Sequence, residues 1–313
     1  MANTPYSNFY LSNEVEDQFN SHLDLMQFCK PDRTLTGTAG MTRKINIYKA
    51  TDGTEKLAKG VGNTKSIEVS YTQREYKIQL AQNRFKYYDE DAMEDPMIVP
   101  VGVRHGATDM FNTVNGDVYG EIKKAKRVLL ASKFDFAAFT DAVSMFNLEN
   151  LEGASIYALV HPKDMAAIRK ALGEDLKYVE AFAKNGYVGT VAGVNVYSKK
   201  DATPGAIYIA KRDALTALIK KGTEVEQIAK NNRSEDAANT RENYIYTRKY
   251  YLVALTDERY DVKITAGTAS ASTDTSVSAS KTYYAADGAG YVAVTPGEGD
   301  NPKTKGWYEI TAA

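Results

Sequence analysis

The chain has few of the residues that most often build reactive or metal-binding centres. Among 313 residues there are one cysteine, three histidines and one tryptophan. Cys29 has no second cysteine to pair with, which excludes an intrachain disulfide and a disulfide-stabilised scaffold. We interpret Cys29 as a small buried apolar residue, because a catalytic thiol needs a positioned histidine. The histidines, His22, His105 and His161, show none of the spacings typical of zinc or metalloprotease sites.

Long apolar runs and an excess of one charge are also missing. No apolar stretch reaches the roughly 18 residues that a membrane-spanning helix needs, and residues 1–5 lack the basic start of a signal peptide. We therefore expect a soluble product that is not exported and has no membrane partner. Lys and Arg number 39 and Asp and Glu 40, which excludes a global basic field that would recruit nucleic acid. A content of 43% hydrophobic and 25% charged residues is typical of a globular protein and excludes wholesale disorder.

The motifs of common enzymes are absent as well. Gly60 and Gly62 lack the third glycine of a dinucleotide fingerprint, and no phosphate-binding loop or nucleophile elbow occurs. An acidic cluster precedes the longest predicted helix, and we interpret it as a turn and helix-dipole feature. Its members are Asp89, Glu90, Asp91, Glu94 and Asp95. The basic runs at 123–127 and 199–200 are typical of solvated faces. The sequence thus predicts no catalytic residue, no cofactor and no metal site.

The first third of the chain predicts an arm followed by an extended β-ribbon. Residues 1–40 are polar and aromatic with one weak helical patch, and alternating patterns at 43–48, 66–71 and 76–80 predict strands. Between them, residues 55–65 carry two glycines and three lysines and predict a loose tip. Because a two-stranded hairpin is marginal in water by itself, we expect this ribbon to lie on another surface, such as a neighbouring copy of the chain.

A long helix and a compact domain follow. Apolar residues at steps of three and four predict a helix over 100–130, about 40 Å long. Short alternating elements from residue 135 onward, including a strand at 156–160 and a helix starting at Pro162, predict a compact α/β domain. Residues 213–220 are read as helical.

The C-terminal part returns to strands. Residues 244–256 and 260–264 predict long strands of a second sheet, and the Thr, Ser, Ala and Gly composition of 265–282 predicts a linker or weak strand. Two aromatic-rich strands within 283–310 are too few to fold alone. Trp307 and Tyr308 are the candidate surface contacts of this tail, as stacking residues.

Four local phrases stand out in the second half of the chain. They are Val160-His161-Pro162-Lys163-Asp164, Arg169-Lys170-Ala171-Leu172-Gly173, Val191-Ala192-Gly193-Val194-Asn195-Val196-Tyr197 and Lys211-Arg212-Asp213-Ala214-Leu215. Together with the order of the elements, they resemble the major capsid proteins of tailed bacteriophages, whose Hong Kong 97-type fold is also found in encapsulin shells. The resemblance covers residues 1–265 and implies an α+β capsid fold. It divides the chain into an N-terminal arm (1–40), an extended β-ribbon loop (41–88), a peripheral domain with the spine helix and a β-sheet (89–134 and 233–265), a compact α/β axial domain (135–232), and a C-terminal linker with a small β extension (266–313).

The resemblance implies a structural protein, not an enzyme. It implies self-assembly through hexamers and pentamers into an icosahedral virion shell around double-stranded DNA, which the inner face contacts without sequence specificity. A separate scaffolding protein and a portal are expected, with assembly in the host cytoplasm. We expect intersubunit contacts at Lys56, Lys59, Lys65, Tyr71 and Tyr76, and no covalent crosslink. An encapsulin-like compartment shell remains the alternative, and a soluble hydrolase or binding protein is a third hypothesis.

Overall fold

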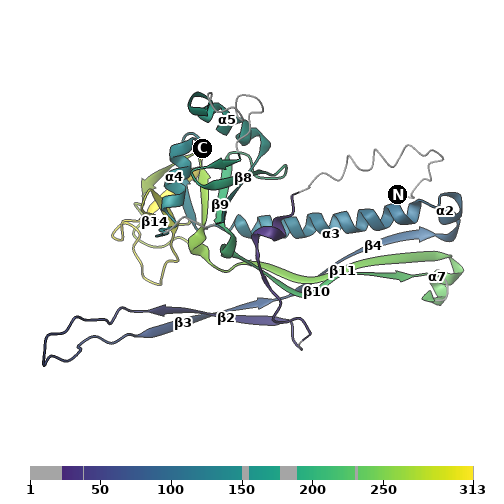
Figure 1. Cartoon of the computed structure of the whole chain (residues 1–313), viewed down its shortest axis with the longest axis horizontal. Coiled ribbons are helices and arrows are strands. Elements are labelled where there is room, and N and C mark those ends of the chain that lie inside the picture. The colour runs from purple at the N-terminus through teal and green to yellow at the C-terminus, as the bar shows by residue number, and fades with distance from the viewer. Residues whose placement is uncertain (1–22, 38, 150–154, 177–188, 230–231, 313) are drawn as a thin grey trace.

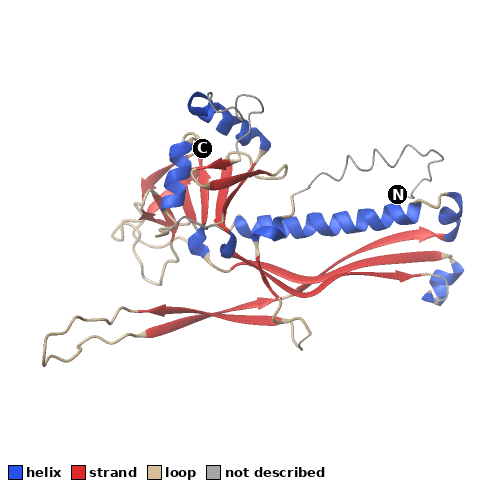
Figure 2. Ribbon diagram, in the orientation of Figure 1, coloured by secondary structure: helices blue, strands red, loops and turns tan. Residues whose placement is uncertain are grey.

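The molecule is elongated. The computed structural model describes residues 23–37, 39–149, 155–176, 189–229 and 232–312. Figures 1 and 2 show a compact sheet domain at one end, a long helix lying along a long sheet, and a two-stranded ribbon that projects away from both.

The long sheet has four strands. Their spatial order is β1 (Lys30–Asp32), β10 (Leu215–Ile228), β11 (Glu242–Leu255) and β4 (Gln79–Tyr88). Helix α3 (Ile98–Ile122) covers one face of this sheet. The helix approaches closely at Gly102, where an added Cβ would lie 2.3 Å from the Phe85 ring. Asn83 fixes the same contact by donating a 2.7 Å hydrogen bond to the carbonyl of Gly106.

The compact domain is built on a sheet of ten strands. In spatial order they are β13 (Gly267–Ala271), β16 (Tyr308–Ala312), β14 (Tyr284–Asp287), β15 (Gly290–Ala293), β5 (Arg127–Leu130), β12 (Asp261–Thr265), β9 (Ala206–Lys211), β6 (Ile156–Val160), β8 (Val194–Ser198) and β7 (Thr190–Val191). Strand β6 is buried along its whole length, which fits a strand covered on both faces.

The two faces of this sheet pack against different elements. Helices α4 (Phe136–Ser144) and α5 (Pro162–Leu176) cover one face, where Ala158, Ile209 and Val262 belong to their core. The opposite face packs against the end of α3 and the short helix η1 (Leu25–Phe28). This second core joins the compact domain to the long sheet.

The projecting ribbon consists of β2 (Thr42–Ala50) and β3 (Val69–Lys77), paired antiparallel with each other and with no third strand among the described residues. The remaining elements are short: α2 (Asp89–Glu94) and α7 (Glu235–Asn239) at the far end of the long sheet, and η2 (Arg212–Ala214) and η4 (Glu258–Tyr260) near the compact domain.

The C-terminal extension joins the compact domain through strand pairing. Strand β15 pairs with β5, so residues after 266 extend the ten-stranded sheet. Tyr283 and Trp307 form the small core of this extension, with ring centroids 5.9 Å apart. Trp307 is only 8% exposed, so its prediction as a surface stacking residue is wrong for this chain.

Two predicted helical segments are strands instead. The long helix ends at Ile122 and not at residue 130, because Val128 and Leu129 pair with β12 and are buried there. Residues 213–220 belong mostly to β10, which is held between β1 and β11. In both cases pairing with distant strands overrides a local helical pattern.

Strand pairing also differs from the predicted division of the chain. Strand β4, placed with the extended loop at 41–88, pairs with β11 in the long sheet. Strand β10, placed with the axial domain, pairs with β11 as well. Strands β5 and β12, placed with the peripheral domain, lie inside the ten-stranded sheet.

Candidate assembly site

One face of the ribbon becomes more apolar toward its tip. The paired side chains on this face run from a charged pair through an amide pair to apolar pairs: Lys44 with Glu75, Asn46 with Gln73, Tyr48 with Tyr71, and Ala50 with Val69. Gln73 donates a 3.0 Å hydrogen bond to Asn46, and the two tyrosine rings lie 6.0 Å apart. Such cross-strand pairs stabilise the ribbon locally.

This face is uncovered in the single chain. Tyr48 and Tyr71 are each 65% exposed. Large exposed apolar side chains continue toward and around the tip; the set is Tyr48, Leu57, Val61, Ile67, Val69 and Tyr71. We call these six residues the ribbon patch. Large exposed apolar side chains gathered on one projecting element make it a candidate interaction surface.

The base of the ribbon is fixed to its own subunit. Arg74 of β3 pairs with Glu258 at 3.0 Å, and Lys126 pairs with the same carboxylate at 2.8 Å. Burial acts to raise the pKa of Glu258, but Lys126 and Arg74 together hold that pKa below its ordinary value. Tyr76 is half-buried beside Arg74, so it faces its own subunit. The ribbon therefore leaves the body in a defined direction.

The tip loop has local order. Glu55 accepts hydrogen bonds from the backbone N–H and the hydroxyl of Thr64, at 2.8 and 2.9 Å. Gly53 packs so closely on Ile67 that a Cβ would lie 2.7 Å from its side chain. The predicted contact residues Lys56, Lys59 and Lys65 are all exposed on this loop, and within the described residues none of them forms an ion pair.

The face of the long sheet that points away from α3 carries alternating aromatic and basic side chains. We call it the outer face; its residues are Leu80, Gln82, Arg84, Lys86 and Tyr88 on β4 and Glu242, Tyr244, Tyr246, Arg248 and Tyr250 on β11. Cations lie over the rings, with Arg84 at 5.3 Å from the Tyr244 centroid and Arg248 at 5.1 Å from that of Tyr246. Tyrosine and arginine are the residues most enriched in protein interfaces. This surface was not predicted from the sequence, although the alternation at 244–250 is visible there.

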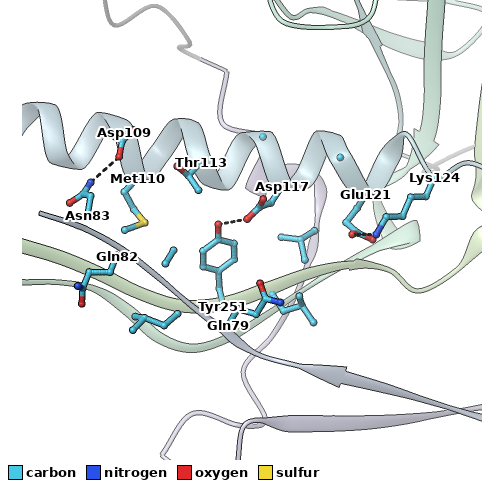
Figure 3. A pocket seen from close by; sticks show the side chains of 16 residues that line it. Gln79, Gln82, Asn83, Asp109, Met110, Thr113, Asp117, Glu121, Lys124 and Tyr251 are labelled. Carbon is cyan, nitrogen blue, oxygen red and sulfur yellow. Dashed lines mark hydrogen bonds and ion pairs between the residues drawn. The ribbon is translucent and has the colours of Figure 1, made fainter.

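The opposite face and α3 enclose a groove of about 750 Å³, shown in Figure 3. Tyr251 donates a 2.5 Å hydrogen bond to Asp117 across it. Burial and, to a lesser degree, Asp117 raise the pKa of Tyr251 well above its ordinary value. Gly116 and Gly120 open onto the groove with nothing within 4 Å of an added Cβ. The Tyr251 hydrogen bond joins the helix to the sheet.

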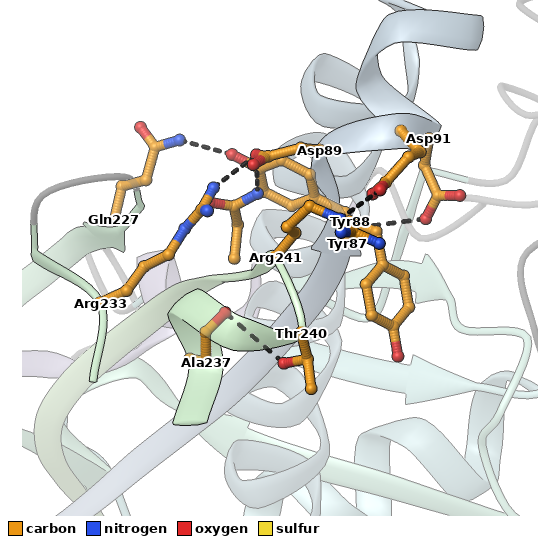
Figure 4. Close-up of polar contacts among 11 residues, drawn as sticks. Tyr87, Tyr88, Asp89, Asp91, Gln227, Arg233, Ala237, Thr240 and Arg241 are labelled. Atoms are coloured by element: carbon orange, nitrogen blue, oxygen red, sulfur yellow. Dashed lines mark hydrogen bonds and ion pairs between the residues drawn. The ribbon is translucent and has the colours of Figure 1, made fainter. Parts of the chain in front are cut away.

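A buried polar network holds the far end of the long sheet, as Figure 4 shows. Arg233 donates to Asn243 from Nε at 3.0 Å and forms an ion pair with Asp89. Asn243, which is almost fully buried, donates a 2.8 Å hydrogen bond to the same Asp89 carboxylate. Asp89, the first residue of the predicted acidic cluster, therefore has a structural role in this network. Among the described residues there is no cluster of histidine, cysteine and carboxylate groups suited to a metal.

The structure also locates the other residues that were considered from the sequence. Cys29 is buried, as predicted. The Nδ1 of His161 accepts a 3.1 Å hydrogen bond from the backbone of Lys163 at the start of α5. Tyr308 is half-buried, with its ring 5.3 Å from that of Tyr291. His22 and most of the predicted arm lie outside the described residues. No helix in the described part of the chain is long and apolar enough to cross a membrane.

Comparison with known proteins identifies solved structures that share this architecture. No family model matches the chain. The capsid of the cyanophage P-SCSP1u aligns over 85% of this chain and 91% of its own, with a TM-score of 0.63 and 12% identity. The mature capsid of bacteriophage PhiM1 covers 85% and 89%, with a TM-score of 0.58 and 10% identity, and that of Ralstonia phage GP4 covers 76% and 87% at 0.58 and 10%. The chain has the phage capsid fold.

Sequence similarity agrees with the fold. Over 269 residues the chain is 25% identical to the major capsid protein of Staphylococcus phage phiMR11, which covers 82% of this chain and 92% of that protein. The resemblance to tailed-phage major capsid proteins and the α+β capsid fold predicted from the sequence are confirmed.

Proposed function

We propose that the chain is a structural major capsid subunit that assembles with its own copies into a closed shell. The observation that carries this proposal is the ribbon patch, an apolar surface on a projecting two-stranded element that nothing in its own subunit covers. A hairpin of this kind gains stability only when a third surface packs on it. A shell provides that surface at every position, because each subunit has identical neighbours.

The outer face of the long sheet is the surface on which a neighbour's ribbon lies in this proposal. Its half-exposed tyrosines offer rigid apolar area, and Arg84 and Lys86 offer donors to the polar end of the ribbon near Glu75. The ribbon offers Tyr48, Tyr71 and Val69 in return. Apolar centres with polar rims are typical of stable interfaces.

The further partners of such a shell are also part of the proposal. We infer hexamers and pentamers in an icosahedral lattice, a separate scaffolding protein, a portal, and double-stranded DNA held by sequence-independent contacts. The place of action is then the virion, after assembly in the host cytoplasm. A compartment shell of the encapsulin kind would use the same contacts, and the contents of purified particles distinguish the two: a genome for a virion, a protein cargo for a compartment.

Amine crosslinking of mixed isotopic populations tests the ribbon contact. Equal amounts of ¹⁴N and ¹⁵N chains are assembled together, treated with a lysine-specific crosslinker and digested for mass spectrometry. We expect mixed-isotope links from Lys56, Lys59 or Lys65 to lysines at the long sheet, such as Lys86. The triple variant Lys56→Arg, Lys59→Arg, Lys65→Arg is the matched control, because it keeps the charge and loses the links. If every crosslink joins two ¹⁴N peptides or two ¹⁵N peptides, the contacts lie within single chains and the proposal is contradicted.

A further inference from the structure

Three buried groups, Tyr157, Asp261 and Cys29, belong to the side of the ten-stranded sheet on which η1 packs. Tyr157 of β6 and Asp261 of β12 both pair with Ala210 of β9, so their side chains emerge on the same face of the sheet, two strands apart. The ring of Phe28 stacks on Tyr157 with centroids 4.3 Å apart, and Cys29 follows it. We call residues 25–29 the docking segment.

Asp261 is buried without any compensating partner. It is 0% exposed, and neither of its carboxylate oxygens has a hydrogen-bond partner; the buried Tyr157 hydroxyl lacks one too. Within the described residues no basic side chain is paired with this carboxyl. The other titratable groups that interact with this site are Tyr157, Tyr208 of β9 and Cys29, all neutral at pH 7.

Full burial without a hydrogen-bond partner therefore favours the protonated form of the Asp261 carboxyl while the segment is docked. Burial raises its pKa well above the ordinary value. The neighbouring backbone N–H of Val262 makes no hydrogen bond with the carboxyl and opposes this shift only in part. Burial, followed by the charge of Asp24, raises the pKa of the Cys29 thiol to about 12. Ionisation of either group requires that water reach it.

We propose that Asp261 controls the docking segment as a proton-dependent latch, in which residues 25–29 stay on the sheet while Asp261 is protonated and lift when it ionises. The proton passes to bulk water as the segment opens, and it returns on closing. The hydrogen bonds of Asn115 to Leu25 and Leu23, each 3.0 Å, also hold the segment to α3 but do not titrate. The proposal concerns the single subunit and does not depend on shell assembly.

The sign of the effect follows from linkage. The docked state binds a proton that the open state releases, so docking weakens as pH rises above the ordinary aspartate pKa of about 4. The opening equilibrium then increases about tenfold per pH unit, until the pKa of the docked state is reached. A variant without a titratable group at 261 loses this dependence.

Cys29 reports this opening, because it is the one cysteine of the chain and lies in the docking segment. The full-length chain is labelled with N-ethylmaleimide between pH 6 and 8.5. Each rate is divided by the rate for the same chain unfolded in urea at that pH, which removes the intrinsic pH dependence of the thiol. We expect the ratio to rise about tenfold per pH unit in the unmodified chain and to stay level in Asp261→Asn.

Asp257→Asn is the matched control, because it makes the same chemical change at a carboxylate that is paired with Arg259 and reached by solvent. It is expected to keep the slope of the unmodified chain. A level ratio in the unmodified chain, or an equal slope in Asp261→Asn, would overturn the proposal.

Hydrogen exchange of the unmodified chain gives a second test that needs no variant to fold. Corrected for the intrinsic exchange rate, the amides of residues 25–29 should lose protection about tenfold per pH unit relative to amides in the middle of α3. Equal changes in both regions would count against the latch.

Discussion

Replacing Tyr71 by serine tests whether the ribbon patch holds subunits together. Tyr71 is 65% exposed in the single chain, and its ring lies 6.0 Å from that of Tyr48 across the ribbon. Its removal should therefore leave the folding of the subunit almost unchanged. Its effect should fall on contacts between subunits.

The size of the effect follows from the area that a neighbour would cover. A tyrosine side chain offers about 150–250 Å², and 65% of it is free. Covering about 130 Å² at about 25 cal/mol per Å² stabilises one contact by about 3 kcal/mol, as an upper bound. Since about 1.4 kcal/mol is a factor of ten, the variant should need roughly 100-fold more free subunit to form shells.

Sedimentation velocity over a series of subunit concentrations measures that threshold. Tyr71→Phe is the matched control, because it keeps the ring and should assemble near the original concentration. Circular dichroism and thermal unfolding of the free subunit confirm that Tyr71→Ser still folds. Assembly of Tyr71→Ser at the unchanged threshold would refute the role of the ribbon patch.

Two further predictions concern the stability of the subunit and use unfolding in urea. Gly102→Ala should lower the free energy of unfolding by about 1–3 kcal/mol, because the new Cβ meets the Phe85 ring, whereas Gly116→Ala, with open space around it, should raise it by about 1 kcal/mol; equal effects would contradict the helix packing described above. Glu258→Gln should cost about 1 kcal/mol at pH 7. Burial acts to raise the pKa of Glu258 but Lys126 and Arg74 lower it overall, so this stabilisation is present above the ordinary value of about 4.3 and is lost as pH falls through the lower folded value. A difference between Glu258→Gln and the unmodified chain that persists near pH 3 would contradict the anchoring role of Glu258.

The local sequence pattern was sufficient to predict those helices and strands whose tertiary contacts favour the same secondary structure. The alternation in β2 and β3 and the helical periods of α3 and α5 appear in the sequence and in the structure. Val128 and Leu129 continue the period of α3, yet pairing with β12 draws them into a strand. The sequence carries no local sign of such pairing, because the partner is more than a hundred residues away.

Prediction of the candidate assembly site depended even more on the pairing of strands that are distant in the sequence. The lysines of the tip loop and Tyr71 could be chosen from composition, and they are exposed. The outer face requires the register of β4 with β11, in which Arg84 lies opposite Tyr246 across about 160 positions of sequence. Asp261 is likewise one more carboxylate in the sequence, and only the fold shows that it is buried without a partner.

Electron microscopy of the purified protein shows whether the chain assembles into shells. The full-length chain is expressed alone and together with a scaffolding protein, and the soluble fraction is imaged in negative stain. We expect closed shells, rings or tubes tens of nanometres across, built from this chain. Uniform single subunits in both preparations would contradict it.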